Sequence, residues 1–303
     1  ESAAEWEERV RIIRDHLTDF YFALNLPYSL FEDIVRSALR PRRPEEEIVL
    51  TFNPELAPWD LLFPQAEQYE QLPPEKREKI IHHLRQIYVV IIRGMISDQL
   101  GFIGVARDHF NITDLKEIRR RRIGRGKIGG KAAGMLLAHK ILQADGADVS
   151  LPLQEHVVIP ESVFLGADVF YDFIAHNNLY PFFDQKYKTE EEIREEYPEI
   201  RRRFAEGEFP SYVVDALARE LDRLGNVPLI VRSSSLLEDN FGTSFAGKYE
   251  SIFCPNQATP RENLQAVLDA IRLVYASTLN PDALLYRRQV GLLDYDERMA
   301  VLI

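Results

Sequence analysis

The sequence has 303 residues, of which 46% are hydrophobic and 28% are charged, and its formal net charge is −11. This length and apolar content suffice for a large core and favour two domains or one domain with an extension, whereas the acidity argues against a nucleic-acid binder. The single cysteine, Cys254, excludes an internal disulfide framework and fits a reducing compartment. No apolar run approaches the ~18–20 residues of a membrane span, so we expect a cytoplasmic protein that does not bind membranes.

The first 118 residues are predicted to form a mostly helical extension. Apolar residues recur at helical spacing over residues 3–40, and Pro74 begins a second, long helix with acidic residues in its first turn. Between these helices we expect a short strand at residues 48–52 and an irregular stretch at residues 54–74. This part of the chain contains no repeat and no catalytic constellation.

A glycine-rich turn, residues 124–134, follows a short basic helix that Thr113 or Asp114 would cap. A turn of this kind that opens a helix is a typical anion site, because the first N–H groups of the helix lack backbone partners. Lys131 lies where turn becomes helix, so its ammonium would reach a phosphate held there. The spacing is wrong for a P-loop and no convincing strand precedes the turn, so a flexible linker with a solvated basic run is the alternative.

A second motif begins with a predicted buried strand at residues 229–231 and continues with Arg232 and three serines. A small-residue loop at 240–247 and a second strand at 249–253 follow. Arginine supplies paired donors in a fixed geometry and a glycine loop supplies backbone N–H groups, so this arrangement suits a phosphate. The alternative is an ordinary hairpin in which Arg232 caps a strand.

From residue 124 onwards predicted strands and helices alternate, which indicates a mixed α and β layer structure. The sequence begins without a methionine and ends in the apolar run Met299–Ile303, so we expect a piece of a longer protein with a final strand that lacks its partner. The other predicted elements of this part are a strand at 156–160 and helices at 166–177, 189–199, 210–224, 259–275 and 281–290.

Four motifs in this order resemble the N-terminal nucleotide-binding domain of phosphoenolpyruvate synthase and pyruvate phosphate dikinase. They are Ile128-Gly-Gly-Lys-Ala-Ala-Gly134, Val231-Arg-Ser-Ser-Ser235, Glu238-Asp239 and Ser244-Phe-Ala-Gly247. The resemblance covers residues 119–303 and implies an α+β, ATP-grasp-like domain that is incomplete at its C-terminus. Residues 1–118 would be the helical extension that precedes it.

In this family ATP phosphorylates a histidine on a separate swivelling domain, which passes the phosphoryl group to pyruvate on a third domain. The resemblance therefore implies that the chain is the ATP-binding portion of a dikinase, with ATP and Mg²⁺ as cofactors and the downstream domains of the same polypeptide as partners. We expect the 303-residue chain alone to be inactive. Rifampin phosphotransferase and glucan water dikinases use a similar ATP domain, so an antibiotic or a glucan is an alternative acceptor.

Transferred to this sequence, the family pattern implies that Lys131 contacts the nucleotide phosphates and that Arg232 clamps them. Gly247 and Ser251 would lie against the triphosphate. No catalytic residue and no metal ligand is assigned, because the magnesium-binding carboxylates of the family would come after residue 303. Glu238 and Asp239 are expected to shape the loop. The sequence departs from the family at Ser235-Leu-Leu237, where smaller residues are usual.

A rival interpretation is a degenerate, non-catalytic ATP-grasp module whose helical extension docks a partner. A third, nucleic-acid binding through Arg119–Arg122, would give a steep salt dependence but conflicts with the overall acidity. Whether the protein forms a homo-oligomer is left open by the sequence.

Overall fold

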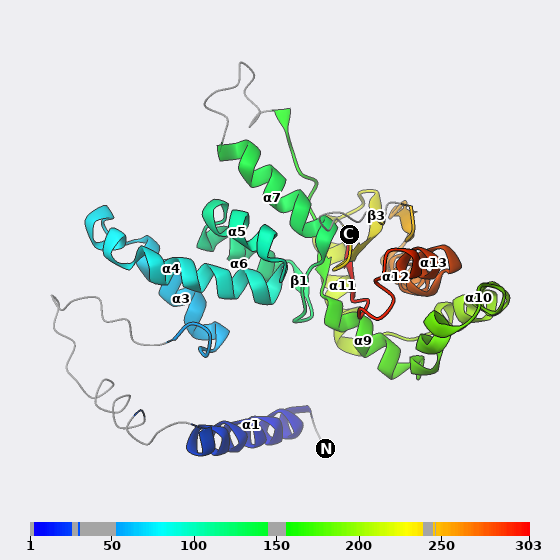
Figure 1. Ribbon diagram of the computed structural model, residues 1–303, viewed down its shortest axis with the longest axis horizontal. Coiled ribbons are helices and arrows are strands. Elements are labelled where there is room, and N and C mark those ends of the chain that lie inside the picture. The colour runs from blue at the N-terminus through cyan, green and yellow to red at the C-terminus, as the bar shows by residue number, and fades with distance from the viewer. Residues whose placement is uncertain (1–2, 26–29, 31–52, 145–155, 239–244, 246) are drawn as a thin grey trace. The chain divides into compact units, whose positions relative to one another are not determined.

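The computed structural model describes residues 3–25, 30, 53–144, 156–238, 245 and 247–303 (Figure 1). The chain divides into two compact units, residues 1–50 and residues 51–303, and each is described by itself. The strand expected at residues 48–52 lies outside the described residues.

The first unit contains one described helix, α1 (Ala3–Asn25). Its apolar residues Val10, Ile13 and Leu17 are exposed, and their spacing places them along one face of the helix. Arg11 pairs with Asp15 one turn later at 3.3 Å, an interaction that supports the helix weakly because both side chains are solvated.

The second unit begins with helices, and the first of them lies where the sequence predicted an irregular stretch. Residues 54–74 were expected to be irregular, yet α3 (Trp59–Glu70) occupies most of this range with Pro64 inside it. Helical spacing of its buried side chains, Leu62, Phe63, Ala66 and Tyr69, outweighs the proline. The helices that follow are α4 (Pro74–Met95), α5 (Leu100–His109) and α6 (Ile112–Arg120).

The basic helix α6 begins earlier than predicted. Its N-cap is Asn111, whose side chain accepts the Asp114 N–H, while the Asp114 carboxylate accepts the Asn111 N–H. Asp114 is therefore the third residue of a capping box and is not the cap itself.

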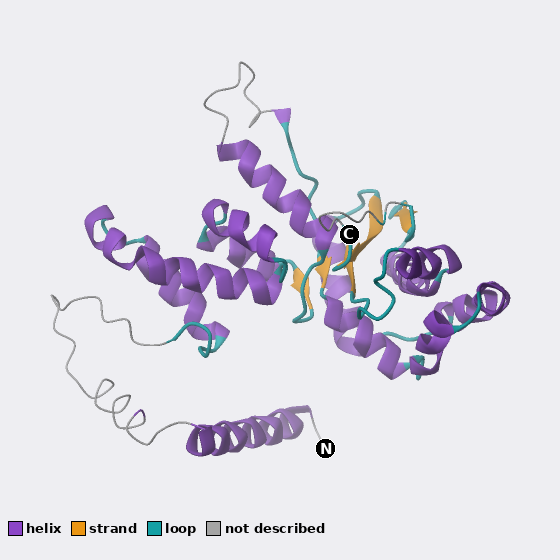
Figure 2. Cartoon of the chain, viewed as in Figure 1, coloured by secondary structure: helices purple, strands orange, loops and turns teal. Residues whose placement is uncertain are grey.

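The sheet of the second unit has five strands in the order β1-β2-β5-β3-β4. Figure 2 shows strands in orange and helices in purple. β1 and β2 are parallel, and the remaining pairs are antiparallel. The strands are β1 (Arg122–Ile123), β2 (Phe164–Leu165), β3 (Leu229–Ser235), β4 (Ser251–Cys254) and β5 (Met299–Leu302).

Two strand predictions were wrong. β5 has partners on both sides, because it lies between β2 and β3, and its residues are buried. Residues 157–163 form no regular structure, and the strand of this region is β2 instead. Val158, in the middle of the predicted strand, is 81% exposed, so its side chain lies outside the core, whereas Val163, beyond the predicted strand, is buried in it.

Helices pack around this sheet, and most lie close to their predicted ranges. α12 contacts β3, β4, α10 and α11, and Thr259 forms the predicted capping box with Glu262 at its start. The helices are α7 (Gly130–Ala144), α9 (Ala167–His176), α10 (Glu190–Ala205), α11 (Ser211–Leu224), α12 (Pro260–Ala276) and α13 (Pro281–Gln289), with 3₁₀ segments η1 (Tyr180–Tyr187) and η2 (Ser277–Leu279).

An aromatic cluster fills the core between α9 and α12. Phe173 lies 4.7 Å from Phe209 and 5.5 Å from Tyr275, measured between ring centroids. Phe170 meets Tyr275 edge-on at 5.0 Å. Tilted and edge-to-face contacts of this kind add to the free energy gained by burying the rings.

The start of α7 packs directly against the end of β3, and two glycines permit this contact. Gly129 has φ +83°, and a Cβ at this position would lie 1.5 Å from the carbonyl oxygen of Ser234. A Cβ at Gly130 would lie 2.0 Å from the carbonyl oxygen of Glu238. Only residues without side chains fit between these two backbones.

The aromatic cluster predicts a large effect of truncating Phe173. Phe173→Ala should lower the free energy of unfolding by about 3–5 kcal/mol, measured by urea denaturation, because it leaves a cavity in the core. The control is Phe253→Ala, since Phe253 is 78% exposed and its loss should change stability by less than about 0.5 kcal/mol. Equal losses in both variants would contradict the assignment of Phe173 to the core.

The glycine contact yields a second prediction. Gly129→Ala should lower the free energy of unfolding by at least about 3 kcal/mol, because the new methyl group overlaps the β3 backbone and the left-handed conformation disfavours alanine. Gly134 lies within α7, the helix that follows Gly129, and a Cβ there meets nothing within 4 Å. Gly134→Ala should therefore stabilise the protein by up to about 1 kcal/mol. Thermal and urea unfolding of the two variants would test this opposite sign.

Candidate functional site

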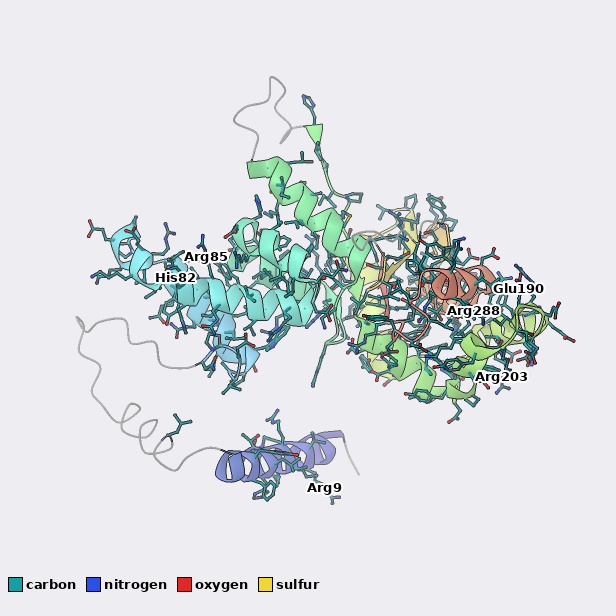
Figure 3. The ribbon with its side chains drawn as sticks, in the orientation of Figure 1. Arg9, His82, Arg85, Glu190, Arg203 and Arg288 are labelled. Carbon is teal, nitrogen blue, oxygen red and sulfur yellow. The ribbon has the colours of Figure 1, made fainter. Side chains whose placement is uncertain are left out.

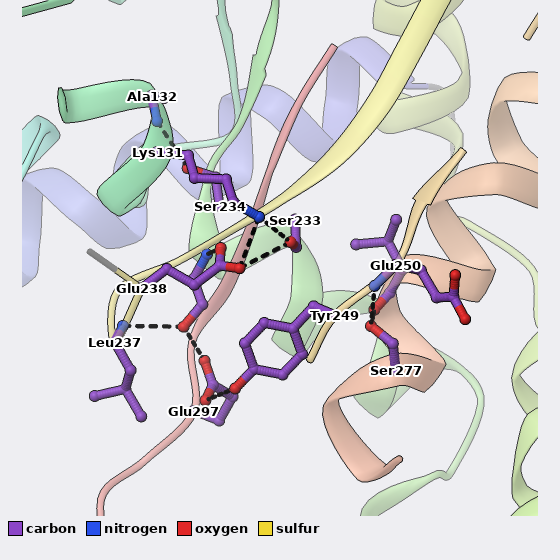
Figure 4. Close-up of polar contacts among 12 residues, drawn as sticks. Lys131, Ala132, Ser233, Ser234, Leu237, Glu238, Tyr249, Glu250, Ser277 and Glu297 are labelled. Carbon is purple, nitrogen blue, oxygen red and sulfur yellow. Dashed lines mark hydrogen bonds and ion pairs between the residues drawn. The ribbon is translucent and has the colours of Figure 1, made fainter. Parts of the chain in front are cut away.

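Lys131, in the first turn of α7, reaches the polar end of β3. Its ammonium lies 2.8 Å from Ser233 Oγ and 2.8 Å from Glu238 Oε1 (Figure 4). The Glu238 side chain is 1% exposed and that of Lys131 is 20% exposed. The two motifs that the sequence singled out separately therefore meet through one ion pair.

All three serines after Arg232 make internal hydrogen bonds and are fully buried. Ser233 Oγ donates to Glu238 at 3.0 Å, and Ser234 Oγ donates to the Ile128 carbonyl at 2.8 Å while accepting the Ala132 N–H at 3.1 Å. Ser235 Oγ donates to Glu297 and accepts the Leu237 N–H. The Ser233 and Ser234 hydroxyls join the start of α7 to the end of β3, and the Ser235 hydroxyl joins β3 to Glu297.

Glu238 has a larger role than the loop-shaping one expected for it. Its second oxygen accepts the Ser235 N–H at 2.9 Å, which shapes the turn as predicted, while its first oxygen pairs with Lys131. The spacing Ser-x-x-Glu, from Ser235 to Glu238, matches half of a capping box, because the glutamate accepts the serine N–H but the serine hydroxyl accepts the N–H of Leu237. The ion pair with Lys131 has no comparable signal, because it joins residues 107 positions apart.

A second buried carboxylate, Glu297, lies on the other side of Ser235. It accepts hydrogen bonds from Ser235 Oγ and, at 2.6 Å, from Tyr249 OH, and the Arg287 guanidinium lies 3.9 Å away. Burial raises the pKa of Glu297 despite the opposing charge of Arg287. Burial together with the Glu297 charge raises the pKa of Tyr249 well above its ordinary value. Sequence reasoning did not single out Glu297.

The glycine turn does hold an anion, and that anion is a side chain of the protein. Asp168, in the first turn of α9, accepts the N–H of Arg125 at 2.6 Å and the N–H of Gly126 at 2.7 Å. These two backbone donors are thereby satisfied within the fold. The basic turn is anchored to α9 and is not a free linker.

Arg232 and Ser251 are direct neighbours across the antiparallel pair β3–β4, so the structure brings these two predicted site residues together. Ser233, which follows Arg232, binds Lys131. Within the part of the chain that the structure describes, no carboxylate lies within ion-pair distance of the Arg232 guanidinium. Gly247 is exposed and has φ +73°; among the described residues it makes no hydrogen bond with Lys131 or Arg232.

The helices that precede the glycine turn also contact the site. The Ile128 N–H donates to the carbonyl of Met95 at 3.1 Å, and Lys127 pairs with Asp98 at 3.3 Å. Gln99 donates to the carbonyl of Leu236 at 3.5 Å. The segment between α4 and α5 thus touches both motifs.

No group of three or more histidine, cysteine, aspartate or glutamate side chains in the described part of the chain is arranged to hold a metal ion. None of the described helices combines the length and apolarity needed to cross a bilayer.

Comparison with known proteins identifies the family of this chain. Residues 125–303 match the family described as the pyruvate phosphate dikinase AMP/ATP-binding domain. A rifampicin phosphotransferase of Streptomyces sviceus is 28% identical to the chain over 201 residues, which cover 63% of this chain and 20% of the relative. The chain thus spans about a fifth of the length of this curated relative. Because the family match extends over more than half of the sequence, the chain belongs to the family of the pyruvate phosphate dikinase AMP/ATP-binding domain.

Proposed function

We propose that this chain forms one wall of an ATP site in a phosphoenolpyruvate synthase-like dikinase with an ATP-grasp fold. In this proposal the complete polypeptide transfers a phosphoryl group from ATP to a histidine on a downstream swivelling domain and then to pyruvate. The observation that carries the proposal is the fixed ammonium of Lys131, held at 2.8 Å by both Glu238 and Ser233, the residue that follows Arg232 in β3.

Lys131 and Arg232 supply the positive charge that a triphosphate requires. Lys131 contributes a compact charge at the start of α7, where the helix dipole also favours an anion. Arg232 contributes a planar group of donors that matches phosphate oxygens in pairs.

Gly247 and Ser251 would complete this wall on the side of β4. The left-handed conformation of Gly247, φ +73°, suits a close approach of backbone to ligand, because no Cβ obstructs it. Ser251 is exposed and lies opposite Arg232 in the sheet, so its hydroxyl would be a neighbour of any group that Arg232 binds.

When bound, ATP supplies the γ-phosphoryl group that is transferred. The residues of this chain would bind and orient the phosphates and neutralise their charge, which is most of what catalysis of phosphoryl transfer requires. The donor set fits the triphosphate, since it consists of two cations and a glycine-rich backbone. It does not supply a magnesium site among the described residues, so we expect the Mg²⁺ ligands to come from residues downstream of the chain.

The proposal predicts that Lys131→Ala and Arg232→Ala each weaken ATP binding. Each change should raise the dissociation constant of ATP, measured in the presence of Mg²⁺, roughly 10- to 100-fold. This increase corresponds to the free energy of a lost hydrogen bond to a charged group. Isothermal titration would be performed on the 303-residue chain and on a longer polypeptide that includes the downstream region. We expect weaker binding by the shorter chain.

Arg203→Ala is the matched control for this experiment, because Arg203 is exposed on α10 and away from these motifs (Figure 3). It should leave the dissociation constant unchanged. If the longer polypeptide binds ATP equally well after the Lys131 and Arg232 substitutions, the assigned roles are wrong.

The rival function is a nucleotide- or partner-binding module without catalysis. The contacts of Met95, Asp98 and Gln99 with the two motifs favour it, since they tie the helical part to the site. Incubation of the complete polypeptide with ATP, followed by detection of phosphohistidine, separates the two functions: a dikinase becomes labelled and a binding module stays unlabelled. Competition of pyruvate with rifampicin or a glucan for the phosphoryl group would then identify the acceptor.

A further inference from the structure

We propose that Glu238 is a positioning residue that holds the Lys131 ammonium in place for a nucleotide phosphate. This inference rests on the proposed function, in which Lys131 binds the nucleotide phosphates, and it names the residue that holds Lys131 in position. Glu238 would not contact the nucleotide itself and would act on it only through Lys131.

The ammonium, the carboxylate and a hydroxyl form a closed triangle. Lys131 Nζ lies 2.8 Å from Glu238 Oε1 and 2.8 Å from Ser233 Oγ, and Ser233 Oγ lies 3.0 Å from the same carboxylate oxygen. A lysine ammonium has three hydrogen-bond donors. Two are used by Glu238 and Ser233, and one remains for a ligand on a side chain that keeps 20% exposure.

Glu238 itself is held rigidly, so it is able to fix another group. Its Oε2 accepts the Ser235 N–H at 2.9 Å, and its backbone carbonyl packs against Gly130 so closely that a Cβ there would lie 2.0 Å away. The carboxylate is therefore constrained by the end of β3, and the backbone of Glu238 by the start of α7, which carries Lys131. A flexible lysine held in this way loses less conformational entropy when it binds a ligand.

A purely structural role for Glu238 makes a different prediction. A buried carboxylate needs a partner to offset its lost hydration, and Lys131 would serve as that partner even if no nucleotide were bound. In that case replacing Glu238 would harm the fold regardless of Lys131. The two roles are distinguished by whether the effect on the nucleotide requires Lys131.

A double-mutant cycle with ATP and Mg²⁺ as the probe tests this requirement. Glu238→Gln should raise the dissociation constant of the 303-residue chain about tenfold, and Lys131→Met at least as much. Glu238→Gln added to Lys131→Met should have little further effect, because the residue through which it acts is gone.

The same cycle separates failure of this inference from failure of the proposed function. If Glu238→Gln leaves ATP binding unchanged, or weakens it equally in the Lys131→Met background, Glu238 does not position Lys131. If Lys131→Met leaves ATP binding unchanged, the proposed role of Lys131 is wrong and this inference fails with it.

A second readout does not depend on the nucleotide. The rate at which an N-hydroxysuccinimide ester acylates Lys131, followed by mass spectrometry, should rise several-fold in Glu238→Gln, because a released amine is more accessible. Glu297→Gln is the matched control, since Glu297 is also a buried carboxylate, 4% exposed, but makes no contact with Lys131 among the described residues. Equal rates in the native chain and Glu238→Gln would overturn the inference.

Ser233→Ala provides a test that can still be made if the Glu238→Gln variant does not fold. It removes one of the two partners of Lys131 with little change in volume and leaves the ion pair intact. We expect a smaller increase in acylation rate and a smaller loss of ATP affinity than in Glu238→Gln. No change in either measurement would show that this polar triangle does not hold the lysine.

Discussion

The contact between Gly129 and Ser234 is the constraint on which the site depends. The two backbones approach so closely that a Cβ on Gly129 would lie 1.5 Å from the Ser234 carbonyl oxygen. This approach fixes the start of α7 against the end of β3, and the Lys131 ammonium can reach Ser233 and Glu238 only because of it. A side chain at position 129 would separate the two motifs that carry the positive charge.

The close approach buries polar groups of both backbones, and each of these groups needs a hydrogen-bond partner. Ser234 bonds both the Ile128 carbonyl and the Ala132 N–H, which would otherwise be buried without partners at a cost of about 1–3 kcal/mol each. Ser235 joins the two buried carboxylates: its N–H donates to Glu238, and its hydroxyl donates to Glu297. Such a network specifies one arrangement of turn and strand, because any other arrangement would leave some of these buried groups without hydrogen bonds.

Local chemistry made much of this fold predictable. The capping box at Thr259, the strand at residues 229–231 and the proline that begins α4 follow from short-range patterns, and the structure has each of them. The predictions that failed depend on distant residues. β5 has two partners because β2 and β3, more than 60 residues away along the chain, lie on either side of it, and no local pattern encodes that pairing.

The same distinction applies to the candidate site. Lys131 and Arg232 were singled out because cations beside glycine and serine have a recognisable chemistry, and their assignment as ATP ligands remains a prediction. Glu297 escaped notice because an acidic residue before a strand is ordinary in a sequence. Its importance comes from burial beside Ser235 and Tyr249, which only the tertiary structure supplies.

The helices before the family-matched region belong to the environment of the site. The match begins at residue 125, yet the Ile128 N–H bonds Met95 and the Leu236 carbonyl accepts from Gln99. Leu237, the residue after Leu236, is buried in the core. Since Gln99 bonds the carbonyl next to that buried leucine, a shift of the α4–α5 segment would act on the turn that holds Glu238. The helical part and the nucleotide-binding part of residues 51–303 therefore share the interactions that position Lys131.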